Sequence, residues 1–199
     1  MREWLLAPQG RLRLFEDWLA PSEAQSLLAA LPNALHWHEP RVRLFGREHV
    51  ARRLQAWVGD AGADYRYSGV TLTPQAWTPA LVRLRERLSD EFGLRFNSVL
   101  LNHYRCGEEG MGWHSDDEPS LGRNPCIASL SLGATRDFCL KPRPGVSGER
   151  FCLPLPQGSL LLMEGDMQHH WMHAVPPRRR VRDERFNLTF RLIRGVHGT

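Results

Sequence analysis

The strongest constraint on the fold is the pattern of residues from position 95 onward. There, short alternating segments are separated by glycine, proline and polar residues, which is typical of antiparallel sheets in a sandwich or barrel. The candidate strands are 96–104, 127–132, 136–141, 151–155, 159–163, 171–175 and 185–193. Because helical patterns precede them, we expect an α+β fold that is mainly β, with a jelly-roll double sheet braced by N-terminal helices.

Two helices are predicted before these strands. Ser22 and Gln25 have capping-box spacing, and the apolar residues that follow recur at helical intervals until Pro32. A second helix is expected after Thr78, with an apolar stripe that Gly93 ends. We expect this second helix to pack on the core.

Length and composition limit the number of domains and the membrane segments that this chain can form. A chain of 199 residues is long enough for one domain with a substantial core and marginal for two. No window approaches the ~20 apolar residues that cross a bilayer, and Pro8 breaks an N-terminal apolar patch too short for a signal peptide. We therefore expect a single cytoplasmic domain without membrane contact.

The cysteines and the net charge give weaker indications of the compartment and the partners of the protein. The four cysteines have no close pair of the kind that marks a zinc site or a redox dithiol, so we expect buried thiols in a reducing compartment. They are Cys106, Cys126, Cys139 and Cys152. A net charge of +4 is compatible with an anionic partner, although Lys141 is the only lysine and an arginine bias can reflect genome composition. The charged segment 176–184, "PPRRRVRDE", fits a solvated loop or a phosphate-contacting one equally well.

One short stretch, "GMGWHSDDE" at residues 110–118, has the residues of a metal site. In an extended segment His114 and Asp116 point the same way, so both can face one metal ion. A third ligand is available in "QHHWMHAVP", from His169, His170 or His173. Two histidines and one carboxylate would leave positions open on Fe(II) for a cosubstrate and oxygen.

The last predicted strand, "RFNLTFRLI", alternates completely. Its apolar face holds Phe186, Leu188, Phe190 and Leu192, and its polar face holds Arg185, Asn187, Thr189 and Arg191. Such a strand is either half solvated or lines a barrel that binds a small dicarboxylate, because guanidinium groups pair with carboxylates in two-pronged fashion. Asn102 and Tyr104 share one face of an earlier strand and could bind the same acid.

Taken in order, these motifs resemble the AlkB family of Fe(II)/2-oxoglutarate-dependent nucleic-acid demethylases, and most of all its DNA-repair homologues. The motifs are N-x-Y, H-x-D-D-E, "SLSLGATRDF", "GSLLLM", W-x-H and R-x-N-x-T-x-R. The resemblance runs from "RLFG" at residue 43 to Ile193 and implies a double-stranded β-helix with a nucleotide-recognition lid. Within one domain, 1–199, it implies an N-terminal extension and helix at 1–42, the lid and supporting helix at 43–93, and the dioxygenase core at 94–193.

The resemblance also implies roles for individual residues. Catalytic iron would be bound by His114, Asp116 and His173, the last of which closes the W-x-H motif. Residues that would bind 2-oxoglutarate are Tyr104 and Arg185 at its distal carboxylate, Asn102 and Arg191 near the end that chelates iron, and Asn187 between the arginines. Six residues of ideal strand span ~20 Å, so both arginines reach one diacid only if their side chains lean inward or the strand bends.

On the substrate side, Asp117 and Glu118 would lie at the mouth of the pocket, where negative charge suits a cationic methylated base. The lid segment interleaves arginines with aromatic residues, as expected where a base is extruded and stacked, although the aromatics also fit ordinary packing. The candidate substrate-binding residues there are Arg53, Trp57, Tyr65, Tyr67 and Ser68. Arg52 and Val58 depart from the family pattern.

The implied activity is oxidative demethylation repair of 1-methyladenine and 3-methylcytosine in DNA. It couples decarboxylation of 2-oxoglutarate to succinate with release of formaldehyde. The implied partner is alkylated DNA, with RNA as an alternative, and no membrane or obligate protein partner is evident. The alternatives are the same core acting on RNA or protein, and a non-catalytic nucleic-acid-binding module, against which the full set of iron and cosubstrate positions argues.

Overall fold

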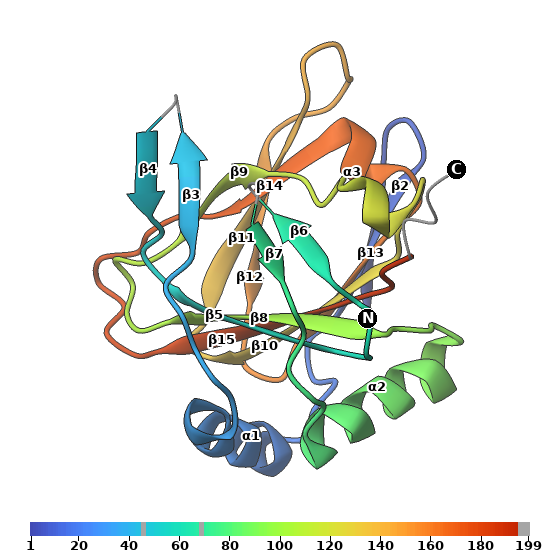
Figure 1. Cartoon of the computed structure of the whole chain (residues 1–199). Helices are drawn as coiled ribbons and strands as arrows, with labels where there is room; N and C mark the ends of the chain where they lie inside the picture. The colour runs from blue at the N-terminus through green and yellow to red at the C-terminus, as the bar shows by residue number, and fades with distance from the viewer. Residues whose placement is uncertain (45–46, 68–69, 195–199) are drawn as a thin grey trace.

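The computed structural model describes residues 1–44, 47–67 and 70–194, and its strands form two main antiparallel sheets (Figure 1). The large sheet comprises, in spatial order, β1 (Arg2–Leu6), β2 (Gly10–Phe15), β13 (Leu160–Glu164), β10 (Ile127–Gly133), β15 (Arg185–Arg191), β8 (Ser98–Tyr104) and β5 (Leu54–Gly59). The small sheet comprises β12 (Phe151–Leu155), β11 (Arg136–Pro142), β14 (Trp171–Val175) and β9 (Met111–His114). This architecture confirms the predicted mainly β, jelly-roll class.

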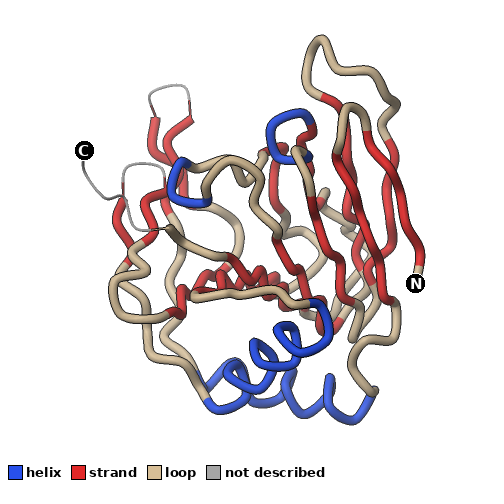
Figure 2. Tube along the Cα trace, turned by 90° about the vertical axis from the view of Figure 1, so that its right-hand side faces the viewer, coloured by secondary structure: helices blue, strands red, loops and turns tan. Residues whose placement is uncertain are grey.

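Helices α1 (Pro21–Ala34) and α2 (Pro79–Phe92) cover the outer face of the large sheet (Figures 1 and 2). Leu31 of α1 and Leu84 of α2 share one buried cluster with Leu101 of β8 and Phe190 of β15. Each fully buried side chain of this size contributes about 1.5–3 kcal/mol. A second cluster, which includes Leu14 and Leu140, lies between the sheets.

The helix ends test the sequence predictions. For α2, Thr78 Oγ1 accepts a hydrogen bond from the Leu81 N–H at 3.3 Å, and Gly93 closes the helix in the left-handed region at φ 67°, both as predicted. The predicted capping box of α1 is wrong, because the helix begins at Pro21, whose fixed φ suits a first turn. This helix also continues past Pro32 to Ala34, so the proline lies in its last turn.

All seven predicted strands are present, but the sheets contain more. The expected core at 94–193 omits β1, β2 and β5, which belong to the large sheet, and β9 is not among the predicted strands. Two hairpins, β3 (Arg41–Leu44) with β4 (Arg47–Val50) and β6 (Tyr65–Tyr67) with β7 (Val70–Leu72), lie on the side of the large sheet opposite α1 and α2 (Figure 1). They fall within the segment expected to form the lid.

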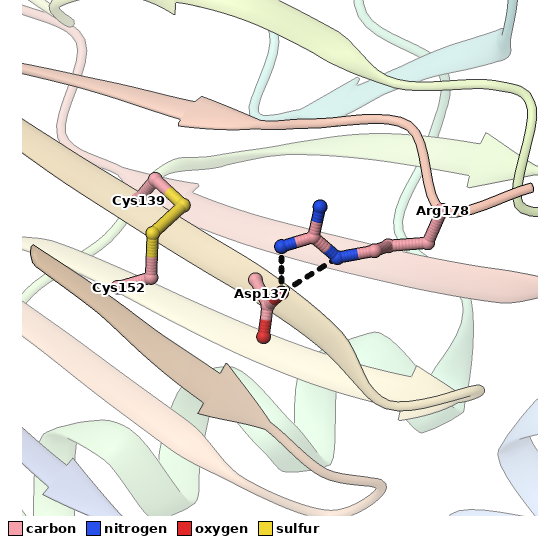
Figure 3. Close-up of a disulfide and its surroundings, with 4 residues drawn as sticks. All are labelled: Asp137, Cys139, Cys152 and Arg178. Atoms are coloured by element: carbon pink, nitrogen blue, oxygen red, sulfur yellow. Dashed lines mark hydrogen bonds and ion pairs between the residues drawn. A yellow bond between two sulfur atoms is a disulfide. The ribbon is translucent and has the colours of Figure 1, made fainter.

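The cysteines differ from expectation. Cys139 and Cys152 are direct partners in the β11–β12 ladder and form a disulfide, with Cα atoms 4.0 Å apart (Figure 3). The prediction of four thiols was wrong for this pair because a separation of 13 residues does not reveal strand register. Cys106 and Cys126 are free. The disulfide removes one argument for a reducing compartment, so the cytoplasmic location stays a prediction.

None of the described helices is long and apolar enough to cross a membrane.

Candidate functional site

The polar face of β15 points between the two sheets. In the β15–β8 ladder Arg185 pairs with Tyr104 and Asn187 with Asn102, while Phe186 lies in the helix-facing core. This arrangement decides between the two interpretations of the alternating strand, because its polar side chains are enclosed by protein and not half solvated.

Three side chains that could ligate a metal meet at this interior. His114 ends β9, Asp116 follows it, and His173 pairs with His114 in the β14–β9 ladder. One candidate ligand atom from each lies within 4.8 Å of the other two, and no other such group occurs in the described part of the chain. His170 of α3 (Met167–His170) faces Asp166 at 3.6 Å, and His169 contacts the Arg123 carbonyl, so neither joins the group.

Neighbouring groups hold the triad in place. His114 Nδ1 lies 2.8 Å from the Gly112 carbonyl, which fixes the ring and leaves Nε2 to act as a ligand. The Asp116 N–H donates to Gln168 Oε1 at 2.9 Å, and Arg191 Nη2 donates to Asp116 Oδ1 at 2.8 Å. Gln168 is not among the predicted site residues, because its position before two histidines gives no signal of its own.

The electrostatics suit metal ligation. Burial opposes ionisation of Asp116, but Arg191 and the two histidines outweigh it and lower the pKa of the carboxyl. Burial, with a further contribution from His114, lowers the pKa of His173 to about 3. At neutral pH the site therefore offers an ionised carboxylate and a neutral imidazole, which are the protonation states that bind metals.

Arg185 gives the site a buried cation. Its guanidinium carbon lies 5.5 Å from the Tyr104 ring centroid, and Nη2 donates to Ser131 Oγ at 2.9 Å. Burial lowers the pKa of Arg185 to about 10, so it is still charged at neutral pH. Its Nε and Nη1 atoms are buried without a hydrogen-bond partner among the described residues. Unused donors on a buried cation favour an anionic ligand.

One cavity joins the three candidate metal ligands to Tyr104, over whose ring the Arg185 guanidinium lies. It is lined by Asn102, Tyr104, His114, Asp116, His173, Asn187 and Arg191, together with apolar side chains such as Leu100, Phe138 and Met163. Asn187 Nδ2 donates to Ser129 Oγ at 2.7 Å, and Asn102 Oδ1 accepts from Arg53 Nε at 2.8 Å. The buried His173 Nδ1, which has no hydrogen-bond partner in the described residues, and the unused Arg185 donors fit a metal ion and a dicarboxylate respectively.

The expected substrate residues are more scattered. Asp117 is exposed and accepts a hydrogen bond from Arg143, and Glu118 beside it is half-buried. Arg53 is buried and donates a hydrogen bond to Asn102, one of the residues predicted to bind 2-oxoglutarate.

The expected lid aromatics receive less support. Trp57 is 2% exposed and packs in a buried cluster with Leu100 and Leu121, because β5 belongs to the large sheet. This burial does not favour a contact between Trp57 and a base, and its role in substrate binding stays a prediction. Tyr65 and Tyr67 lie in β6, where only the backbone is described, and Ser68 lies outside the described residues.

Comparisons with known proteins agree with this site. The chain matches the 2OG-Fe(II) oxygenase superfamily over residues 11–191 and therefore belongs to it, which defines Fe(II) and 2-oxoglutarate as the cofactors. Within that superfamily its relatives place it in the AlkB family. It is 42% identical over 201 residues to the alpha-ketoglutarate-dependent dioxygenase alkB homolog 3 of Homo sapiens, covering 94% of this chain and 68% of that protein.

Two further comparisons are informative. The chain is 45% identical over 159 residues to the DNA oxidative demethylase ALKBH2 of Mus musculus, covering 77% of this chain and 66% of that protein. It thus spans about two thirds of the length of these curated relatives. The solved structure of OsALKBH1 superposes with a TM-score of 0.61 at 16% identity, covering 96% of this chain and 100% of that one, and supports the fold.

Proposed function

We propose that this chain is a DNA oxidative demethylase that repairs 1-methyladenine and 3-methylcytosine. The observation that carries the proposal is the His114–Asp116–His173 group, which lines the same cavity as Tyr104 and Arg191. The relatives named as DNA oxidative demethylases support DNA as the substrate.

In this proposal the polar side chains in and beside the cavity divide between metal binding and cosubstrate binding. His114, Asp116 and His173 bind Fe(II). Arg185 and Tyr104 bind the distal carboxylate of 2-oxoglutarate, and the remaining side chains, Asn102, Asn187 and Arg191, orient its other end. Arg191 has a second task, because it also holds the iron-ligating carboxylate at 2.8 Å.

When bound, Fe(II) and 2-oxoglutarate supply the oxidation, in which O₂ and 2-oxoglutarate become succinate and CO₂ and the N-methyl group leaves as formaldehyde. The chain contributes position and exclusion of water. Phe138 stacks against the His173 ring, with centroids 5.1 Å apart, and forms part of an apolar wall with Leu100 and Met163. Such a wall strengthens the electrostatic contacts of a bound diacid.

At the mouth, Asp117 offers negative charge to a base that methylation has made cationic. Arg143 forms an ion pair with this carboxylate. Exposed arginines in the connection between β14 and β15 are available for phosphates, which supply most of the affinity in complexes with nucleic acids. The proposal therefore assigns acids to the base and arginines to the backbone.

The test uses matched DNA and RNA oligonucleotides that each carry one 1-methyladenine, with Fe(II) protein, 2-oxoglutarate and air, and nucleosides analysed by mass spectrometry. We expect demethylation of the DNA by the wild-type chain and none by His114→Ala. Demethylation of RNA alone would move the assignment to an RNA demethylase. Succinate without loss of the methyl group from either strand would mean another substrate. Oligonucleotide binding with neither product, at confirmed iron loading, would favour the binding module.

A further inference from the structure

Trp113 and His114 are consecutive residues of β9 with opposite surroundings. Successive side chains of a strand point to opposite faces. His114 therefore faces the cavity that it lines with Asp116 and His173, which we call the triad cavity, and Trp113 faces the outer side of the small sheet. The Trp113 ring carries two cations, with Lys141 Nζ 4.7 Å and Arg150 Cζ 5.1 Å from its centroid. Cation–π contacts of about 0.5–1 kcal/mol each at exposed sites hold both charges near this surface.

A pocket of about 430 Å³ lies beside this ring. Trp113, Met111 and Pro176 give it apolar walls, while Arg52 and Arg150 line it with positive charge and Glu108 contributes one acid. We call it the Trp113 pocket. Because Lys141 lies over the Trp113 ring, the pocket and its edge together hold three cations and only one carboxylate, that of Glu108. The volume of the pocket lies within the range of small-ligand sites.

The Trp113 pocket adjoins the functional site. Met111 lines both this pocket and the triad cavity, so the two share one wall. Pro176 and Pro177 also line it, and they begin the connection that carries the exposed Arg179 and Arg180. A polyanion whose reacting group enters the triad cavity can therefore continue over this pocket.

We propose that the Trp113 pocket binds the single-stranded DNA that flanks the target base, with Lys141 and Arg150 contacting phosphates and the apolar walls contacting a sugar or base. This inference rests on the proposed function. Apolar and aromatic surface with a cationic rim is the combination that binds single strands without reading sequence. Phosphate contacts of this kind position the strand and add affinity, while selection of the lesion stays in the triad cavity.

The single lysine permits a direct footprint. Wild-type protein is loaded with Mn(II) and 2-oxoglutarate without oxygen and is then treated with an amine-reactive reagent. The treatment is made with and without a single-stranded DNA that carries one 1-methyladenine and about ten flanking nucleotides on each side. We expect this DNA to protect Lys141 severalfold and a trinucleotide with the same lesion to leave it reactive. The N-terminal amine is the internal control. Equal labelling of Lys141 with saturating long DNA would overturn the proposal.

A second experiment measures binding and turnover with Lys141→Gln/Arg150→Gln. The matched control is Arg83→Gln/Arg95→Gln, which removes two exposed arginines at α2 and just beyond it. Each phosphate contact contributes ~0.7 to the slope of log K against log salt on single strands, so the pocket variant should lose about 1.4 from this slope with long DNA. The control variant should retain the slope and demethylate the trinucleotide at the wild-type rate.

The outcomes separate this inference from the proposed function. If DNA binding by the pocket variant depends on salt as in the wild type and demethylation is intact, the proposal for the Trp113 pocket alone is overturned. Its cations would then be available for an acidic protein partner. A wild-type chain that neither binds nor demethylates any of these DNAs overturns both proposals. Protection of Lys141 with a reduced salt slope supports the pocket as the flanking-strand site.

Discussion

Arg191 Nη2 donates to Asp116 Oδ1 at 2.8 Å, and both side chains are 4% exposed. The guanidinium thus keeps the carboxylate that is proposed to bind iron ionised inside the protein before any metal arrives. The pair joins two parts of the proposed site, because Arg191 comes from the cosubstrate strand β15 and Asp116 from the metal-binding turn after β9. Stability, metal binding and cosubstrate binding should therefore be coupled at this contact.

Removing the charge of Arg191 should destabilise the metal-free protein far more than the metal-bound protein. Arg191→Met leaves a buried carboxylate without its partner, and breaking such pairs costs about 3–5 kcal/mol in the free energy of unfolding. Bound Mn(II) would supply replacement charge and restore most of this loss. Urea unfolding with and without Mn(II) measures the difference. Arg2→Met, which removes an exposed partner of Glu16, is the control and should cost roughly 0–1 kcal/mol. Equal losses in both metal states would contradict the coupling.

Gln168 should act as a positioning residue for the metal. Gln168→Leu removes the acceptor for the Asp116 N–H, and loss of such supporting hydrogen bonds weakens metal binding by about 10–100-fold. Titration with Mn(II), followed by electron paramagnetic resonance, measures this affinity without turnover. Gln168→Glu retains an oxygen acceptor and should bind Mn(II) more tightly than the leucine variant. If the two variants bind Mn(II) equally, the hydrogen bond is not the cause.

Arg185 should determine the affinity for 2-oxoglutarate. Lysine keeps the charge but not the planar set of donors, so Arg185→Lys should weaken binding of the diacid about 10–100-fold. Calorimetry on the Mn(II)-loaded protein without oxygen measures this effect. Mn(II) affinity serves as the control and should change little, because Arg185 is not one of the three candidate metal ligands. Unchanged 2-oxoglutarate affinity would remove Arg185 from the proposed cosubstrate site.

The rate at which Cys126 is alkylated should depend on pH. Burial raises the pKa of the Cys126 thiol to about 12, so the reactive thiolate is scarce at neutral pH. Alkylation of native Cys126 by iodoacetamide should be slow and should accelerate roughly tenfold per pH unit above neutrality, since only the thiolate reacts. Peptide mass spectrometry should find Cys139 and Cys152 labelled only after reduction. Labelling of Cys126 as fast in the native protein as in urea would refute the burial effect.

Much of the site was predictable because its chemistry lies in short motifs. The spacing of His114 and Asp116, and the alternation from Arg185 to Arg191, can be seen without a structure. Spacing alone leaves the third histidine open, since His169, His170 and His173 lie within five positions, and only the resemblance of the W-x-H motif favours His173. Strand pairing selects His173, because β14 places it directly opposite His114 in the ladder.

The missed features depend on pairing between distant segments. Leu12 and Leu14 alternate with arginines in β2, which is a strand signal, yet only the ladder with β13 shows that this strand extends the core sheet. Trp57 looked like a lid aromatic because arginines surround it in sequence, whereas the β5–β8 ladder buries it. The Cys139–Cys152 bond likewise follows from register, which no residue spacing specifies.

The central claim is tested most directly by the stoichiometry of one reaction. Fe(II) protein is mixed without oxygen with 2-oxoglutarate and a single-stranded DNA carrying one 1-methyladenine; air is then admitted, and adenine, succinate and formaldehyde are quantified together. The account predicts equal amounts of the three products from the wild-type chain and none from Asp116→Ala. Adenine formed without succinate, or demethylation that survives in Asp116→Ala, would contradict it.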